Sequence, residues 1–163
     1  MSHQCRFCQS RLQLTVADLG EMPWSNSFLE PTPEAIARER KFPLKVMVCL
    51  ECLLIQTTAT ISPEEIFNAE YAYHSSYSAS WLAHAKRYAE DMAQRYALGP
   101  TSQVIEAASN DGYLLQYFAA EGIPVLGIEP AANAAKIAEE RGVPSEVAFF
   151  GRTTAVQLAE RGI

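Results

Sequence analysis

The sequence predicts an α/β protein in two parts, a small β-rich N-terminal domain followed by a parallel sheet with helices. Two observations support this fold class. All four cysteines and most of the nine prolines of the 163-residue chain precede Gly99-Pro100. Strand-like and helix-like segments then alternate to the last residue, which is typical of βαβ units. We therefore expect domains at residues 1–62 and 100–163, joined by a helical connector at residues 63–99.

Three segments of the N-terminal domain have the composition of strands: "RLQLTVADLG", "FPLKVMVC" and "LLIQTTATI", the last two on either side of "CLEC". The connector begins with "SPEEIF", where a serine cap, a proline and two glutamates are typical of a helix start. Residues 78–98 repeat apolar side chains every three or four positions, which predicts a helix that ends at Gly99-Pro100.

The last domain alternates strands and helices. The expected strands are "QVIEAA", "PVLGIEP" and "SEVAFF", and the expected helices are "GYLLQYFAAEG", "AANAAKIAEERG" and "RTTAVQLAERG". This spacing predicts a parallel sheet, because parallel neighbours need a crossover connection. Only about three strands fit into the sequence, so the first of them is expected to have an open edge.

The cysteines form two C-x-x-C pairs, Cys5 with Cys8 and Cys49 with Cys52, separated by 40 residues. Each pair can hold a metal from one tight turn, and two pairs complete a tetrahedral shell of four sulfurs. This set favours structural zinc, with no open position for a catalytic water. A redox dithiol, an iron–sulfur cluster and free thiols are the alternatives.

Carboxylates cluster where the first strand of the last domain ends. Glu106 lies inside the strand, Asp111 lies in the polar turn after it, and Glu129 ends the second strand. Ligands of open α/β sheets bind at this edge. The G-x-G-x-x-G fingerprint of a pyrophosphate site is absent, and two acids repel phosphate, so a cationic nucleoside such as S-adenosylmethionine fits better than NAD. Alternatively, Asp111 stabilises a turn and Glu129 lies at a helix N-terminus.

The overall charge narrows the class of partner. A net charge of −6 and a pI of 5.1 argue against nucleic acid or an anionic membrane as the main partner. No apolar run approaches the roughly 20 residues that span a bilayer. The polar N-terminus "MSHQCRFCQS" has no apolar signal core, which predicts a cytoplasmic protein.

Several stretches together resemble the S-adenosylmethionine-dependent sugar C-methyltransferases with an N-terminal zinc-binding domain, which methylate C3 of a nucleotide-linked 4-keto sugar. The matching stretches are "CRFC", "DLGEMPWSNSFLEP", "FPLKVMVCLECLLIQ", "YAYHSSYSASW", "VIEAASNDGYLL", "GIEPAANAAKIAEERGVP" and "FFG". They cover nearly the whole chain in the family's order. In place of the G-x-G that methyltransferases usually carry after the strand acid, this chain has Ala-Ala-Ser-Asn.

The resemblance implies a fold and a set of sites. The fold is a zinc domain followed by the first half of a class I methyltransferase, or Rossmann-like, sheet. Zinc is implied on the four cysteines. S-adenosylmethionine is implied on the following residues: Glu106, Ser109, Asn110, Asp111, Gly112 and Glu129. The implied substrate is a nucleotide sugar that reacts through its enolate, in a deoxysugar pathway.

The aromatic stretch "YAYHSSYSASW" supplies the predicted catalytic residue, Tyr71, whose hydroxyl would face the sugar; packing is the alternative role. Because the family's base lies mainly downstream, we expect this chain to be a fragment that lacks part of the catalytic machinery. Two other functions compete with the enzyme. One is a zinc-ribbon adaptor that binds a partner protein, or a second copy of itself, along the open edge. The other is a divergent NAD-binding piece.

Overall fold

The computed structural model describes residues 3–59 and 61–163, and the chain divides into two compact units, Met1–Ser62 and Pro63–Ile163. We refer to them as the N-terminal unit and the C-terminal unit.

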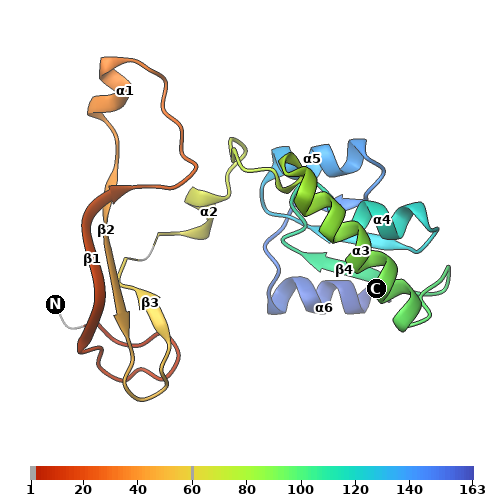
Figure 1. Ribbon diagram of the computed structural model, residues 1–163, viewed down its shortest axis with the longest axis horizontal. Coiled ribbons are helices and arrows are strands. Elements are labelled where there is room, and N and C mark those ends of the chain that lie inside the picture. Colours follow the sequence, from red (N-terminus) through yellow and green to blue (C-terminus); the bar gives the residue numbers. More distant parts are fainter. Residues whose placement is uncertain (1–2, 60) are drawn as a thin grey trace. The chain divides into compact units, whose positions relative to one another are not determined.

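The N-terminal unit is built on an antiparallel sheet (Figure 1). In the residues described, its strands are β1 (Leu14–Pro23), β2 (Lys41–Val48) and β3 (Ile55–Thr57), in the order β1-β2-β3. The β1–β2 register is irregular between Asp18 and Glu21, where Gly20 adopts a left-handed φ of 73°. A short helix, α1 (Pro33–Ala37), lies between β1 and β2, and the Thr32 side chain caps it.

The core of this unit is small. Its buried cluster, among the residues described, consists of Cys5, Leu12, Met47 and Cys49, with Cys52 packed against it. Many apolar side chains of β1 and the nearby loops are exposed instead. The unit therefore buries little apolar surface, and two of these four buried residues are cysteines.

The C-terminal unit contains the predicted parallel sheet. In the described part of the chain its strands are β4 (Val104–Ala107), β5 (Val125–Ile128) and β6 (Ser145–Glu146), in the order β4-β5-β6. β4 pairs with β5 from Val104↔Val125 to Ala107↔Ile128. β4 therefore lies at an edge of the sheet.

Helices pack on both faces of this sheet. The unit contains α2 (Pro63–Ile66), α3 (Ala79–Arg95), α4 (Leu115–Ala120), α5 (Ala132–Glu140) and α6 (Arg152–Glu160). Helices α3, α4 and α5 share one core: Ala89, Ala93, Leu115, Phe118, Ile123, Ala138 and Val143. On the other face, Leu126 and Ile128 of β5 pack against Leu158 of α6. Successive β5 residues point to opposite faces, so one strand serves both cores.

The predicted fold class is confirmed, and the differences from the prediction are local. Helix α4 begins at Leu115, later than Gly112, because Asn110 and Gly112 adopt left-handed φ values of 50° and 75° that no helix contains. Strand β6 has two residues of the expected six. Helix α1 was not predicted. No helix within residues 3–59 and 61–163 is long and apolar enough to cross a membrane.

Candidate functional sites: a four-cysteine centre and a cavity at the strand ends

The four cysteines of the N-terminal unit lie together. Their sulfur atoms all lie within 4.8 Å of one another. Cys5 Sγ is 3.6 Å from Cys52 Sγ, and Cys8 Sγ is 3.5 Å from Cys49 Sγ. Zn–S bonds of about 2.3 Å in a regular tetrahedron require S–S distances of about 3.8 Å. The sulfurs are thus spaced as a tetrahedral zinc shell requires, with only small adjustments.

The two C-x-x-C turns have the same backbone form. The residue after the second cysteine of each turn, Gln9 or Leu53, has a left-handed φ of 63°. The amide of that residue donates to the carbonyl of the first cysteine, at 3.0 Å in both turns. This geometry directs both thiols of each pair to the same side.

Neighbouring groups favour thiolates on part of the cluster. Hydrogen bonds, chiefly from the Cys8 backbone and also from the Gln56 side chain, lower the pKa of Cys5 to about 6. The Leu54 backbone also favours the Cys52 thiolate, but burial and the three neighbouring sulfurs outweigh it and raise the pKa of Cys52 to about 12. A bound cation removes this conflict, because it lets all four sulfurs be thiolates. The four-cysteine cluster therefore fits structural zinc.

The polar turn of the C-terminal unit, residues 109–112, lies at the carboxyl ends of β4 and β5. Glu129, only 3% exposed, accepts the Asn110 amide on one oxygen and the Ala131 amide on the other, both at 2.8 Å. It thus joins the end of β5 to the turn and to the start of α5. Each of its oxygens has a further lone pair that can accept a hydrogen bond.

Residues 71–77, which we name the strap, lie against this turn. Asn133 donates to the Tyr71 carbonyl at 2.8 Å. Asn110 donates to the Tyr73 carbonyl at 3.1 Å and accepts the Ser75 amide at 2.8 Å. Three side chain–backbone bonds therefore fix the course of the strap, although Tyr73 is largely exposed.

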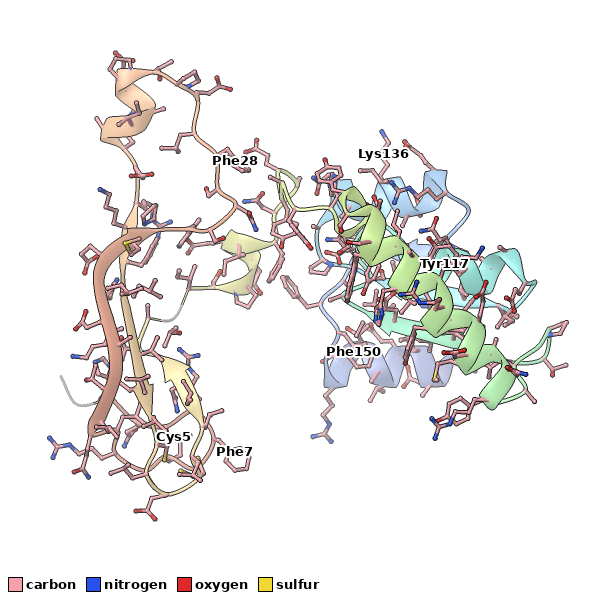
Figure 2. The ribbon with its side chains drawn as sticks, viewed as in Figure 1. Cys5, Phe7, Phe28, Tyr117, Lys136 and Phe150 are labelled. Atoms are coloured by element: carbon pink, nitrogen blue, oxygen red, sulfur yellow. The ribbon has the colours of Figure 1, made fainter. Side chains whose placement is uncertain are left out.

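Strap, turn and strand ends enclose a cavity of about 470 Å³, within the range of small-molecule sites. It is lined by Pro63, Phe67, Tyr71, Tyr73, Ser75, Ala107, Ala108, Asn110, Tyr113, Glu129, Pro130, Phe149 and Phe150. The lining is mainly aromatic and apolar, with a carboxylate and an amide at one end. Phe150 lies just before the start of α6 at Arg152 (Figure 2).

Burial shifts the acids and phenols around the cavity. It raises the pKa of Glu106 to about 7, and the neighbouring Glu129 carboxylate adds to this effect while a hydrogen bond from Tyr113 opposes it. Burial and the Glu106 charge raise the pKa of Tyr113 to about 12. Burial and Glu129 also raise the pKa of Tyr71. At neutral pH both phenols are therefore protonated and able to donate hydrogen bonds.

The predicted site residues take different places. Tyr71, Asn110 and Glu129 line the cavity. Ser109 and Asp111 are fully buried and Gly112 is buried, and none of the three lines the cavity. A Cβ on Gly112 would lie 3.1 Å from the Ala138 side chain, so this glycine lets the turn approach α5 closely.

Glu106 lies in β4 and does not line the cavity. It accepts a hydrogen bond from Tyr113, but its Oε2 is buried and has no partner among the described residues.

Sequence reasoning missed several residues that the structure brings to the site. Tyr113, Phe149 and Phe150 line the cavity, and Arg141 contacts Asp111 from the end of α5. The stretch "FFG" contributed to the resemblance, but nothing in it assigned a contact.

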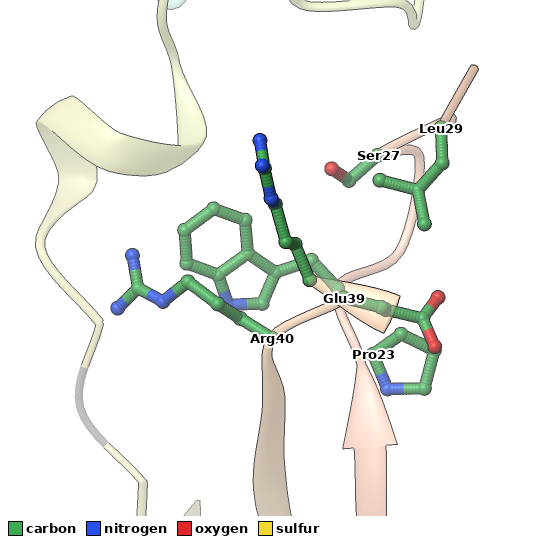
Figure 3. A pocket seen from close by; sticks show the side chains of 7 residues that line it. Pro23, Ser27, Leu29, Glu39 and Arg40 are labelled. Atoms are coloured by element: carbon green, nitrogen blue, oxygen red, sulfur yellow. The ribbon is translucent and has the colours of Figure 1, made fainter. Parts of the chain in front are cut away.

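A smaller cavity lies in the N-terminal unit (Figure 3). It has a volume of about 150 Å³ and is lined by Pro23, Trp24, Ser27, Leu29, Arg38, Glu39 and Arg40. The Arg40 guanidinium lies 5.1 Å from the centres of both the Trp24 and the Phe42 rings, which stack on each other. The cation therefore stabilises the aromatic pair beside this cavity.

Comparisons with known proteins bear on the four-cysteine centre and on the relationship of the chain as a whole. Residues 5–67 match the family described as "Putative zinc binding domain". Over 158 residues, 97% of this chain, the sequence is 32% identical to a protein of Streptomyces niveus named C-methyltransferase NovU. The chain spans 37% of that relative's length. The predicted resemblance is thus confirmed: the chain is a distant relative of a C-methyltransferase, and its residues 5–67 match a zinc-binding domain family.

Proposed function

We propose that the C-terminal unit binds S-adenosylmethionine and that the chain supplies the zinc and cofactor parts of a C-methyltransferase acting on a nucleotide-linked keto sugar. The observation that carries the proposal is the aromatic cavity at the carboxyl ends of β4, β5 and β6, with Glu129 at its edge. An adenosine fits such a lining, because aromatic and apolar side chains cover its base and a carboxylate accepts its ribose hydroxyls.

A buried acceptor in this unit supports a ligand rich in donors. Glu106 Oε2 is buried without a partner in the described structure. Glu106 and Asp111 both lie near the end of β4, where their negative charges would repel a phosphate. An ammonium or hydroxyl group near them would be favoured by the same charges. The proposed cofactor has these groups and no phosphate.

The residues present take specific parts in the proposed reaction. S-adenosylmethionine supplies an electrophilic methyl group. Tyr71, a protonated phenol facing the cavity, would donate a hydrogen bond to the enolate oxygen of the sugar. Its raised pKa makes it a poor base, so another group must remove the proton next to the ketone. A reducing compartment such as the cytoplasm suits the four thiolate ligands.

A direct test is isothermal titration of the purified chain with S-adenosylhomocysteine, S-adenosylmethionine and NAD. We expect the two S-adenosyl compounds to bind and NAD not to bind. Glu129→Gln should weaken their binding by roughly tenfold or more, the cost of an impaired charged hydrogen bond. The matched control is Glu140→Gln, which removes the same charge from the exposed end of α5. NAD binding, or no binding of the S-adenosyl compounds, would contradict the proposal.

The edge position of β4 favours a second candidate function, an adaptor that pairs with another chain. The exposed Ile105 lies on this edge strand, and an unpaired strand edge is a template for pairing. The partner is a second copy of the chain or another protein. Light scattering across a concentration series distinguishes the functions, because self-association abolished by Ile105→Lys supports the adaptor. A monomer that binds S-adenosylhomocysteine supports the enzyme.

A further inference from the structure

We propose that Asp111 is a positioning residue, which together with Ser76 and Arg141 holds the strap over the cavity and does not itself contact the cofactor. This proposal deepens the proposed function and rests on it, because the cavity is the proposed S-adenosylmethionine site. The sequence pointed to Asp111 as a cofactor ligand. The geometry assigns it another role.

The three side chains form a polar cluster around Asp111 Oδ2, while Asp111 Oδ1 is buried without a partner among the described residues. The Ser76 hydroxyl donates to Asp111 Oδ2 at 2.5 Å. Arg141 Nη1 lies 3.0 Å from the same oxygen, and Arg141 Nη2 donates to the Ser76 hydroxyl at 2.9 Å. Arg141 Nη1 also donates to the Asp111 carbonyl at 2.8 Å. One guanidinium therefore contacts the side chain and the backbone of the turn as well as the strap.

The place of Asp111 rules against a direct contact. Its side chain is 0% exposed and does not line the cavity, whereas its neighbour Asn110 does. The oxygen that has partners, Oδ2, faces the strap, and the Ser76 amide also points to it at 3.4 Å. A buried carboxylate needs such compensation, and a guanidinium together with a hydroxyl provides it.

Near this end the strap has one other side-chain anchor in the described part of the chain, Asn110 Oδ1, which accepts the Ser75 amide at 2.8 Å. Tyr77 is 76% exposed, and its hydroxyl contacts only the nearby His74 ring among the contacts described. Asn133 and Asn110 hold the strap from Tyr71 to Ser75, and the Asp111 cluster holds its continuation at Ser76. Loosening this end should therefore let both tyrosines move away from the cavity that they line.

The test reads the strap directly, through the hydrogen exchange of the Ser75 and Ser76 amides measured by NMR on the full chain. We expect Asp111→Asn and Arg141→Met to accelerate exchange of both amides by roughly tenfold or more, since each variant opens the cluster locally. The control is Lys136→Met, which removes a cation from the exposed face of the same helix (Figure 2) and should leave both rates unchanged. Ser76→Ala is a milder variant that keeps the buried ion pair.

Titration with S-adenosylhomocysteine then separates the two roles of Asp111. If Asp111 positions the strap, each of the three cluster variants weakens the binding of S-adenosylhomocysteine. The double variant, Asp111→Asn with Arg141→Met, then binds no more weakly than either single variant. If it contacts the cofactor, Asp111→Asn weakens binding while Arg141→Met and Ser76→Ala do not, which overturns the proposal. Unchanged amide exchange in all three folded variants also overturns it. A wild-type chain that binds no S-adenosylhomocysteine refutes the proposed function, whereas the amide exchange still decides the role of the cluster.

Discussion

Replacing Glu106 by glutamine should stabilise the C-terminal unit above neutral pH. The carboxyl lies in β4, its Oε2 is buried and has no partner in the described part of the chain, and burial raises its pKa from 4.5 to about 7. The folded state therefore holds the proton more tightly than the unfolded state does. Stability is fully present below about pH 4.5 and is lost as the pH rises through about 7. Glutamine has nearly the same shape and cannot ionise.

The magnitude follows from the shift. A rise from 4.5 to about 7 corresponds to about 3 kcal/mol at 1.36 kcal/mol per pKa unit. The side chain is partly exposed, so solvent screening reduces this value. We therefore expect Glu106→Gln to raise the free energy of unfolding by about 1–3 kcal/mol at pH 8 and by little at pH 5.

The assay is urea unfolding followed by tryptophan fluorescence in a Trp24→Phe background. Trp81 then reports the C-terminal unit alone, where its ring stacks on Tyr113 at 5.9 Å. Both proteins are measured from about pH 5 to pH 8, and their difference cancels every other group that titrates.

The result that would refute this reasoning is a difference between the two proteins that does not change with pH. A variant that is less stable than the parent at pH 8 would show instead that the ionised carboxyl is compensated by donors. That outcome would contradict the raised pKa of Glu106 and with it the description of its Oε2 as an unsatisfied acceptor.

Three further changes test other parts of the structure. Cys49→Ser should reduce bound zinc, measured by atomic emission, from one per chain to almost none, because it removes a buried ligand; retained zinc would exclude the four-sulfur site. Leu53→Asn should raise the free energy of unfolding of the zinc-loaded N-terminal unit by about 0.5–1 kcal/mol in chemical unfolding, since asparagine tolerates a left-handed φ better than leucine. A lower free energy of unfolding would show that the exposed Leu53 side chain makes stabilising contacts. Gly127→Ala should lower the free energy of unfolding by about 1–3 kcal/mol in the same assay, because its Cβ would lie 2.4 Å from Ser109 Oγ. Adding Ser109→Ala to this variant should restore part of the lost stability, and no restoration would show that the alanine clashes with another atom.

The sequence predicted the fold wherever the signals were local. Ser78, expected at the start of the long helix, caps α3 through its hydroxyl, which accepts the Trp81 amide at 3.2 Å. The alternation of strands and helices predicted the parallel sheet. It overestimated β6, because only Ser145 and Glu146 pair with β5. Apolar composition alone does not show where a strand loses its partner.

The candidate sites were predictable to different degrees. The two C-x-x-C pairs predicted the four-cysteine cluster, since each pair forms a local turn whose thiolates commonly bind a metal ion. The contacts of the strap were not predictable, because Ser75 meets Asn110 across 35 residues and Ser76 meets Arg141 across 65 residues. No spacing rule connects such positions. For the same reason Asp111 could be identified as a notable acid, but its partners could not.

The small core of the N-terminal unit links its folding to the supply of metal. Two of the four residues in its buried cluster, within the residues described, are cysteines. A ligand that binds only the folded form stabilises it in proportion to the logarithm of its free concentration, about 1.4 kcal/mol for each tenfold increase. The two cores of the C-terminal unit consist of apolar side chains, and the described residues of this unit contain no comparable cluster of metal ligands. Removing zinc with a chelator should therefore unfold the N-terminal unit and leave the parallel sheet of the C-terminal unit intact. The folded fraction of the N-terminal unit should then follow the free zinc concentration around the protein.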